Sequence, residues 1–207
     1  MHNQWIPSSY KIDYDAALSV APDGVSNLVL FLRETLPSLW RDAYLAADTR
    51  QTNLVELRLG TFDYVCDVCS DLESSGEVAY DQTAQDRVVA AFGISGTAKP
   101  PNANRSAHWI NPNEHLATTE RDHGHLIARC IGGSGLRVNV FSQARLLNRG
   151  RSDQGRLYRQ MEAHCSKRPG TFCFSRPIYA DGSCVPRWVE FGVLKADQTL
   201  WVETFDN

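Results

Sequence analysis

Residues 119–134 read TERDHGHLIARCIGGS, and this stretch concentrates chemically useful side chains. His123 and His125 stand two residues apart after an acidic and a basic residue, and an apolar run and two glycines follow. On a strand, this spacing places both imidazoles on one face. The stretch alone is compatible with a metal-binding clasp, a catalytic base on a strand, or two solvated histidines. The choice depends on the residues that accompany it.

The composition describes a folded domain. A chain of 207 residues with 43% hydrophobic residues and five tryptophans can bury a substantial core, which argues against both disorder and a small disulfide scaffold. No apolar run is long enough to span a membrane. The first twenty residues lack the basic segment and apolar core of a signal peptide. We therefore expect synthesis in the cytoplasm and no membrane association, with export only by a route that needs no cleavable signal.

The net charge of −3 conceals an asymmetry between the two halves of the chain. Residues 1–100 contain 7 Lys and Arg against 14 Asp and Glu, a net charge of −7. Residues 101–207 contain 14 against 10, a net charge of +4. A basic half suggests a polyanionic partner, whereas charge alone is more often explained by ordinary solvated surfaces.

Apolar periodicity predicts a mainly helical region over about residues 24–95. A segment rich in Gly, Pro and Asn follows at 93–115 and is the best candidate for a boundary. Beyond it we expect one or two strands at 115–128 and a helix or helix pair at 141–165. Three strands are expected at 171–180, 187–196 and 199–207. The sequence thus predicts an α+β fold with a helical region of unknown role at 1–100 and a second domain at 101–207.

The six cysteines leave three possibilities open. Cys66 and Cys69 form a CxxC motif, but no second CxxC completes a four-thiolate zinc site. The remaining cysteines are compatible with buried thiols, disulfides or a structural zinc site, and buried thiols are the commonest state of free cysteine. The remaining cysteines are Cys130, Cys165, Cys173 and Cys184.

The residues after His125 supply the other parts needed for phosphodiester hydrolysis. An unperturbed imidazole can take a proton from water near neutral pH. An asparagine carbonyl is a ligand for Mg²⁺, and arginine binds phosphate through paired hydrogen bonds. Here the histidine precedes Asn139 and Asn148, and eight arginines lie between residues 121 and 159: Arg121, Arg129, Arg137, Arg145, Arg149, Arg151, Arg156 and Arg159.

Three motifs together resemble the DNA/RNA non-specific endonucleases of the ββα-metal superfamily. Asp122-His123-Gly124-His125 is similar to the Asp-Arg-Gly-His motif of the family. Asn139 through Gln143 is similar to its Asn-x-x-x-Gln segment, and Leu147 through Gly150 to its Leu-Asn-x-Gly segment. The resemblance covers roughly residues 105–207. It implies a ββα-metal core with antiparallel strands.

The resemblance also implies roles for individual residues. His125 matches the general base, Asn148 the asparagine that binds a single Mg²⁺, and Glu162 an acid that acts through metal-bound water. Mn²⁺ is expected to substitute for Mg²⁺. The predicted site comprises the catalytic residues His125, Asn139, Arg121 and Arg129, the metal residues Asn148 and Glu162, and the substrate contacts Asp122, His123, Gln143, Arg145 and Arg149.

Two departures from the family pattern affect this prediction. His123 replaces the motif arginine that contacts phosphate, so Arg121, Arg129 or protonated His123 has to supply that charge. The segment 151–160 places Glu162 farther from Asn148 than the resemblance leads us to expect, which makes its role less secure.

We predict a Mg²⁺-dependent, sequence-non-specific endonuclease acting on DNA, with RNA as a further candidate substrate and a 5′-phosphate product. Similar domains occur as antibacterial toxins that specialised secretion systems deliver into target cells and that a cognate immunity protein neutralises, and we expect that context here. The alternatives are a nucleic-acid-binding module without catalysis, or a zinc-stabilised interaction protein. For the histidine pair, the competing hypothesis is a zinc clasp that also uses Cys130.

Overall fold

The computed structural model describes residues 7–47, 52–68, 71–72, 78–79, 86–97 and 118–207. Cys69 and most of the predicted boundary segment lie outside these residues. The helices are α1 (Tyr14–Ser19), α2 (Val25–Ala47), α3 (Arg145–Asn148) and α4 (Asp153–Lys167), with short 3₁₀ turns η1 (Ser8–Tyr10), η2 (Arg129–Ile131) and η3 (Arg137–Asn139). No helix within these ranges is long and apolar enough to cross a membrane.

A six-stranded antiparallel sheet forms the middle layer of the molecule, in the order β1-β2-β5-β8-β9-β10. A second pair, β6 and β7, stands beside it, and β3 and β4 form a small third sheet. The strands are β1 (Leu54–Leu59), β2 (Phe62–Asp67), β3 (Asp71–Leu72), β4 (Val78–Ala79), β5 (Arg87–Ile94), β6 (Arg121–His125), β7 (Val140–Ala144), β8 (Phe172–Ile178), β9 (Trp188–Leu194) and β10 (Leu200–Asp206).

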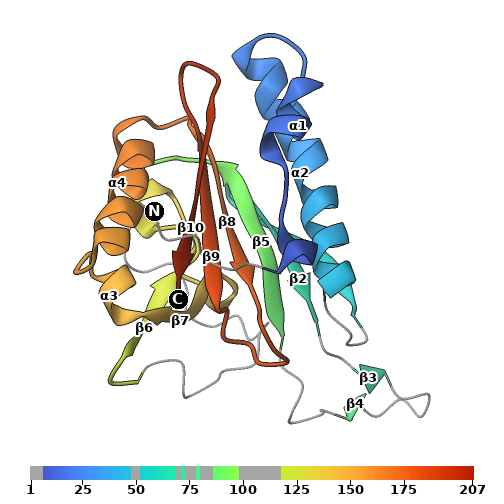
Figure 1. Cartoon of the computed structure of the whole chain (residues 1–207), viewed down its shortest axis with the longest axis vertical. Coiled ribbons are helices and arrows are strands. Elements are labelled where there is room, and N and C mark those ends of the chain that lie inside the picture. Colours follow the sequence, from blue (N-terminus) through green and yellow to red (C-terminus); the bar gives the residue numbers. More distant parts are fainter. Residues whose placement is uncertain (1–6, 48–51, 69–70, 73–77, 80–85, 98–117) are drawn as a thin grey trace.

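Helices cover both faces of this sheet, so the molecule has three layers (Figure 1). Helix α2 lies on one face, where Leu32, Leu36 and Trp40 pack against Phe92 and Phe174. Helices α3 and α4 and the β6–β7 pair lie on the other face, over a separate core. Alternate residues along each strand point to opposite faces, which is how one strand contributes to both cores.

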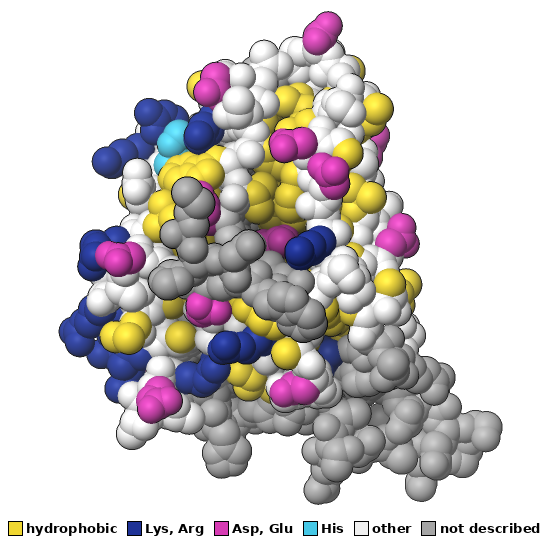
Figure 2. Space-filling model, viewed as in Figure 1, with side chains coloured by type: hydrophobic (Ala, Val, Ile, Leu, Met, Phe, Trp, Pro, Cys, Tyr) yellow, Lys and Arg dark blue, Asp and Glu magenta, His cyan; other side chains and the backbone are white. Residues whose placement is uncertain are grey.

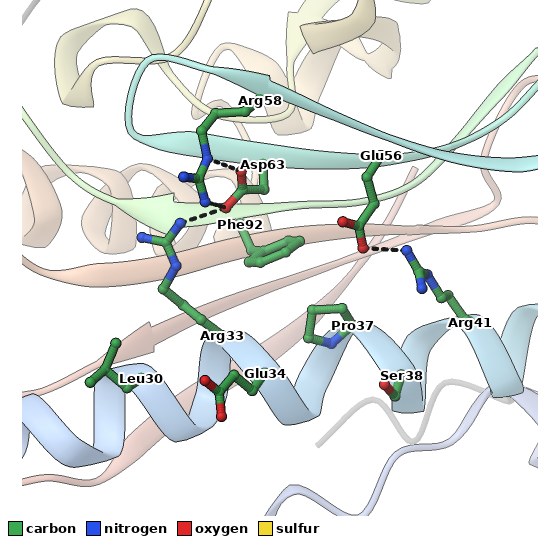
Figure 3. A pocket seen from close by; sticks show the side chains of 10 residues that line it. All are labelled: Leu30, Arg33, Glu34, Pro37, Ser38, Arg41, Glu56, Arg58, Asp63 and Phe92. Carbon is green, nitrogen blue, oxygen red and sulfur yellow. Dashed lines mark hydrogen bonds and ion pairs between the residues drawn. The ribbon is translucent and has the colours of Figure 1, made fainter.

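Helix α2 is also joined to the β1–β2 hairpin by ion pairs, as Figure 3 shows. The Arg33 guanidinium lies 2.5 Å from the Asp63 carboxylate, and Arg58 contacts the same carboxylate at 2.6 Å. A further ion pair joins Arg41 to Glu56. A cavity of about 480 Å³ lies between the helix and the hairpin, with Phe92 and Pro37 among its lining residues.

The α+β fold class, helix in the first part of the predicted helical region and the three final strands are confirmed. Two segments predicted as helical, about 51–73 and 84–94, form strands instead where the structure describes them. Strands β2 and β5 are buried on both faces, so their apolar residues run almost continuously and lose the alternation that distinguishes a strand. Strand β7 was also predicted as helix. The sheet combines strands from both sides of residue 100, the boundary expected from the sequence.

Candidate active site

The histidine motif lies on strand β6, and the apolar run after it leads into the turn η2. Strand β6 pairs with β7 in antiparallel register, with Arg121 opposite Ala144 and His125 opposite Val140. Helix α3 begins at the residue after β7 and packs on both strands. Two strands and a helix therefore place the histidine motif next to Asn148, which is the ββα arrangement that the sequence predicts.

Asp122 is the most heavily hydrogen-bonded acid of this site. Arg149 donates to it through two nitrogens at 2.7 and 2.9 Å, and Arg145 donates through Nε at 3.1 Å. The Nδ2 of Asn148 donates to the same carboxylate at 3.1 Å. These donors, Arg149 first, hold the pKa of Asp122 well below its usual range. Asp122 was predicted to contact substrate, but here its oxygens are occupied by the protein's own donors.

This hydrogen bond fixes the orientation of the Asn148 amide. Because Nδ2 faces Asp122, the carbonyl oxygen faces the opposite way, and no described residue donates a hydrogen bond to it. An amide oxygen held in this way is available as a ligand for a cation. Asn148 therefore occupies the position predicted for a metal ligand, and Asp122 positions it.

Arg159 joins Asn148 to Glu162, and Arg159 is not among the site residues that the sequence predicts. Its guanidinium donates to the backbone carbonyl of Asn148 and, at 3.1 Å, to the carboxylate of Glu162. The side chain of Glu162 is 8% exposed, and burial raises its pKa while Arg159 opposes that rise. The insertion that preceded Glu162 forms the first turns of α4 and brings its carboxylate back toward Asn148. The i,i+3 spacing of Arg159 and Glu162 was the available signal.

His125 is half-buried at the end of β6. Desolvation lowers its pKa, and the positive charge of Arg129 lowers it further. Both effects favour the neutral imidazole, which is the form that accepts a proton. Arg129 was predicted as a catalytic residue, and its position near His125 gives it an electrostatic influence on the base.

The turn η2 connects the surroundings of His125 with those of Glu162. Arg129 lowers the pKa of the His125 imidazole. The pKa of the adjacent Cys130 thiol is raised mainly by burial and also by the negative charge of Glu162, so Cys130 lies near that carboxylate. Helix α4 packs directly against this turn. The predicted base and the predicted metal residues therefore border one region.

Asn139 is buried and makes three side-chain hydrogen bonds to the backbone after His125. Its Oδ1 accepts from the N–H of Ile127 at 2.9 Å, and its Nδ2 donates to the carbonyls of Ile127 and Ser134 at 2.8 and 2.7 Å. It is 0% exposed. Asn139 was predicted as a catalytic residue, but a side chain this buried does not reach a substrate, and its hydrogen bonds instead hold the segment after His125.

Gln143 is the second predicted residue that points inward. It is 1% exposed, and a Cβ added to Gly124 would lie 2.1 Å from its Oε1. Glycine at position 124 leaves the space that this side chain fills. The predicted substrate contact by Gln143 is wrong for this structure, because the side chain packs beneath strand β6 and does not reach the surface.

The remaining predicted residues divide between surface and structural positions. His123 is exposed on β6. The guanidinium of Arg121 donates to the backbone carbonyls of Ser142 and Asn207, both at 3.2 Å. Arg121 thus ties β6 to β7 and to the chain end, so the structure supports a structural position for it and not the predicted catalytic one.

The described residues do not form the alternative zinc clasp. No three His, Cys, Asp or Glu side chains among them gather closely enough to hold a metal ion, and His123, His125 and Cys130 are included in that search. Among the residues that the structure describes, the cysteines form no disulfide with one another. Cys165 and Cys173 lie side by side in the core, and the hydrogen bond that the Cys173 thiol donates to Cys165, followed by burial, raises the pKa of Cys173.

Comparison with known proteins agrees with this geometry. The family model for DNA/RNA non-specific endonuclease matches residues 71–195. The chain belongs to this family. The family is one of metal-dependent nucleases. The match includes all of the predicted site residues.

One solved structure to which the endonuclease is similar is that of Sda1 nuclease with bound zinc ion. The sequences are 26% identical over 42% of this chain and 39% of that one, with a TM-score of 0.35. The endonuclease thus aligns with well under two thirds of that protein. No curated protein matches the chain.

The first prediction concerns Asp122. Asp122→Asn leaves the size of the side chain but removes the charge and one acceptor, so the Asn148 amide is no longer held. We expect the divalent-cation concentration for half-maximal cleavage to rise about 10- to 100-fold. Asp153→Asn is the control, since Asp153 has 95% of its side chain exposed at the start of α4. An unchanged cation dependence in Asp122→Asn would contradict a positioning role.

The second prediction concerns the pH profile of kcat/KM, which reports the pKa of the catalytic base in the enzyme without substrate. Activity requires neutral His125 and falls as pH drops through its pKa, which lies below the ordinary value of about 6.5. Arg129→Ala removes a charge that disfavours the imidazolium, so the pKa rises and the acid limb moves to higher pH. Arg129→Lys keeps the charge and the wild-type limb. The same acid limb in both variants would show that Arg129 does not tune His125.

Proposed function

We propose that this endonuclease cleaves DNA, and RNA as a second substrate, with Mg²⁺ as its cofactor. The observation that carries the proposal is the amide of Asn148, held by Asp122 with its oxygen free. Together with the nearby Glu162 carboxylate it offers oxygen donors, which suit a hard cation. Few protein ligands also fit Mg²⁺, because this ion keeps several waters. Mn²⁺ has the same preference for oxygen ligands and is proposed as a substitute.

The chain's own residues account for the remaining chemistry. Neutral His125 accepts a proton from the attacking water, and Asn139 keeps the segment after His125 fixed during this transfer. When bound, Mg²⁺ would supply positive charge for the phosphate and the leaving 3′-oxygen. Glu162, whose carboxylate Arg159 holds, completes the cation site through water. The proposed product carries a 5′-phosphate.

We further propose that cleavage is independent of sequence. Exposed basic side chains lie around α3 and α4, where Arg149, Arg151 and Arg156 are all exposed. Contacts from such residues to backbone phosphates carry no base information. They also release counterions on binding, so affinity should fall as salt rises.

We propose that this endonuclease is a toxin. A specialised secretion system would deliver it into target cells, and a cognate immunity protein would neutralise it in the cells that make it. The support is the resemblance of the motifs to toxin nuclease domains. A nuclease with little sequence preference endangers the cell that makes it, so a dedicated inhibitor is a physical requirement of this role. The basic surface around α3 and α4 would suit an acidic partner.

The test of the activity is cleavage of plasmid DNA and of total RNA. We expect the wild type to cut both with Mg²⁺ or Mn²⁺, and to stop in EDTA. His125→Ala should reduce the rate at least 100-fold, because it removes the general base. Ladders with 5′-phosphate ends support the proposed product. Absence of cutting with every divalent ion would leave a binding module without catalysis as the better description.

The test of the toxin role uses the catalytically weakened His125→Ala protein as bait in the cells that encode it. We expect one small acidic protein to be recovered in stoichiometric amounts and to inhibit the wild-type nuclease when purified. Recovery of no such inhibitor, together with unimpaired growth of cells that express the wild type alone, would contradict this role.

A further inference from the structure

A second basic cluster lies at the far end of α4 from Asn148. It is formed by His164 and Arg168 at the C-terminal end of that helix and by Lys195 at the end of β9, with Trp201 of β10 beside them. His164, Arg168 and Lys195 border a cavity of about 210 Å³, with Phe172 and Leu194 among its other lining residues. Figure 2 shows basic side chains gathered around a histidine near the upper end of α4.

The cluster has a defined geometry. Nζ of Lys195 lies 5.1 Å from the centre of the Trp201 ring, within cation–π range. The His164 ring meets the same indole edge to face, with 6.3 Å between centroids. Arg168 NH1 lies 3.3 Å from Nδ1 of His164. Trp201 and His164 therefore orient two cations from separate elements toward one cavity.

The backbone under Arg168 is equally well held. Its carbonyl accepts from the Thr171 hydroxyl at 2.6 Å and from the Ser95 hydroxyl at 3.2 Å. The N–H of Gly170 donates to the carbonyl of Ser95 at 2.8 Å. The loop that carries Arg168 is thus fixed to the end of β5, and the arginine is presented from a rigid support.

These cations differ from the arginines that hold the active site together. Arg145, Arg149 and Arg159 are paired with the carboxylates of Asp122 and Glu162. Within the described residues, neither Arg168 nor Lys195 forms an ion pair with a carboxylate. Nearby acids have other partners, since Glu203 accepts from Trp201 Nε1 at 2.9 Å and Asp197 binds the Thr199 hydroxyl at 2.6 Å.

A structural explanation covers only part of the cluster. Basic residues in the last turn of a helix stabilise its negative end, and this accounts for His164 and Lys167. It does not account for Lys195, which comes from the sheet and lies over an indole ring. A basic and aromatic surface at a cavity is instead the pattern that binds nucleic-acid strands.

Helix α4 sets the distance to the active site. Glu162, which Arg159 joins to Asn148, lies six residues before Arg168, a rise of about 9 Å at 1.5 Å per residue. The two residues also lie about 120° apart around a helix about 10–12 Å across, so the path between them over its surface is about 15 Å. One strand of B-form DNA has a phosphate about every 3.4 Å, which makes this path about four to five phosphates. Glu162 and His164 lie about 200° apart around the helix. A strand would therefore cross the outer side of α4, where Arg156 and Lys167 are exposed.

We propose that Arg168 and Lys195 form a second phosphate-binding site for the nucleic-acid substrate, about four to five phosphates from the bond that is cut. Trp201 and His164 hold the two cations in place, and the cavity accommodates the sugar–phosphate unit. The site makes affinity depend on substrate length. This inference rests on the nucleic-acid substrate of the proposed function, but it concerns binding and not the chemical step.

The experiment measures fluorescence anisotropy with labelled single strands of 20 and 4 nucleotides over a salt series, in a His125→Ala background that prevents cleavage. The double variant Arg168→Ala, Lys195→Ala should bind the 20-mer about ten-fold more weakly and the 4-mer unchanged. Its plot of log K against log salt should be shallower by about 1.4, since each single-strand phosphate contact contributes about 0.7.

The matched control is Arg41→Ala, Arg58→Ala, which also removes two positive charges. These residues lie at α2 and at edge strand β1, whereas β10 is the opposite edge of the sheet. The control should bind both strands as the parent does. Equal weakening by both double variants, or equal weakening for both strand lengths, would show a general charge effect and overturn the proposed site.

Cleavage by proteins that retain His125 separates this inference from the proposed function. If the wild type fails to cut with any divalent ion while the Arg168→Ala, Lys195→Ala change still weakens binding of the 20-mer, the proposed function fails and the second site stands. If the wild type cuts but the double variant retains its affinity for the 20-mer, the second site fails and the nuclease stands.

Discussion

The carboxylate of Asp122 is the constraint on which the active site depends. It receives hydrogen bonds from Arg145 and Arg149 on one side and from the Asn148 amide on the other. A single acid thus fastens strand β6 to helix α3 and also decides which end of the Asn148 amide faces outward. Because the same strand ends in His125, β6 carries the proposed base directly and positions the proposed cation ligand Asn148 through Asp122. Loss of this carboxylate would free both guanidinium groups and the amide together.

The sheet explains why the site is held so firmly from beneath. Its strands contribute alternate residues to two cores, one under the β6–β7 pair and α4, the other under α2. Strands β1, β2 and β5 belong to the same sheet as β8, β9 and β10. The acidic first half of the chain therefore supports the platform on which the nuclease motif rests. Trp40, which packs against Phe92 and Phe174, is the centre of that support.

The sequence allowed the motif residues, helix α4 and the last three strands to be predicted, because each has a local pattern. His125 and Asn148 fell where their motifs implied. Strands β2 and β5 could not be recognised, since strands covered on both faces lack alternation. The inward direction of Asn139 and Gln143 was equally hidden. It depends on the turn at 127–134 and on the space beside Gly124, which are properties of the folded chain and not of spacing.

The charge asymmetry of the sequence acquires a more specific meaning in the structure. The surplus of basic residues after residue 100 suggested a polyanion, yet Arg145, Arg149 and Arg159 are engaged by Asp122 and Glu162. Their charges organise the site and are only partly available to a substrate. Among the described residues, Arg168 and Lys195 at the end of α4 form no ion pair with a carboxylate, so an anionic strand that reaches them need not displace one. The count of charges therefore indicated residues 101–207 as the half that meets a polyanion. The pairing of those charges indicates the C-terminal end of α4 as the place where a longer strand gains affinity.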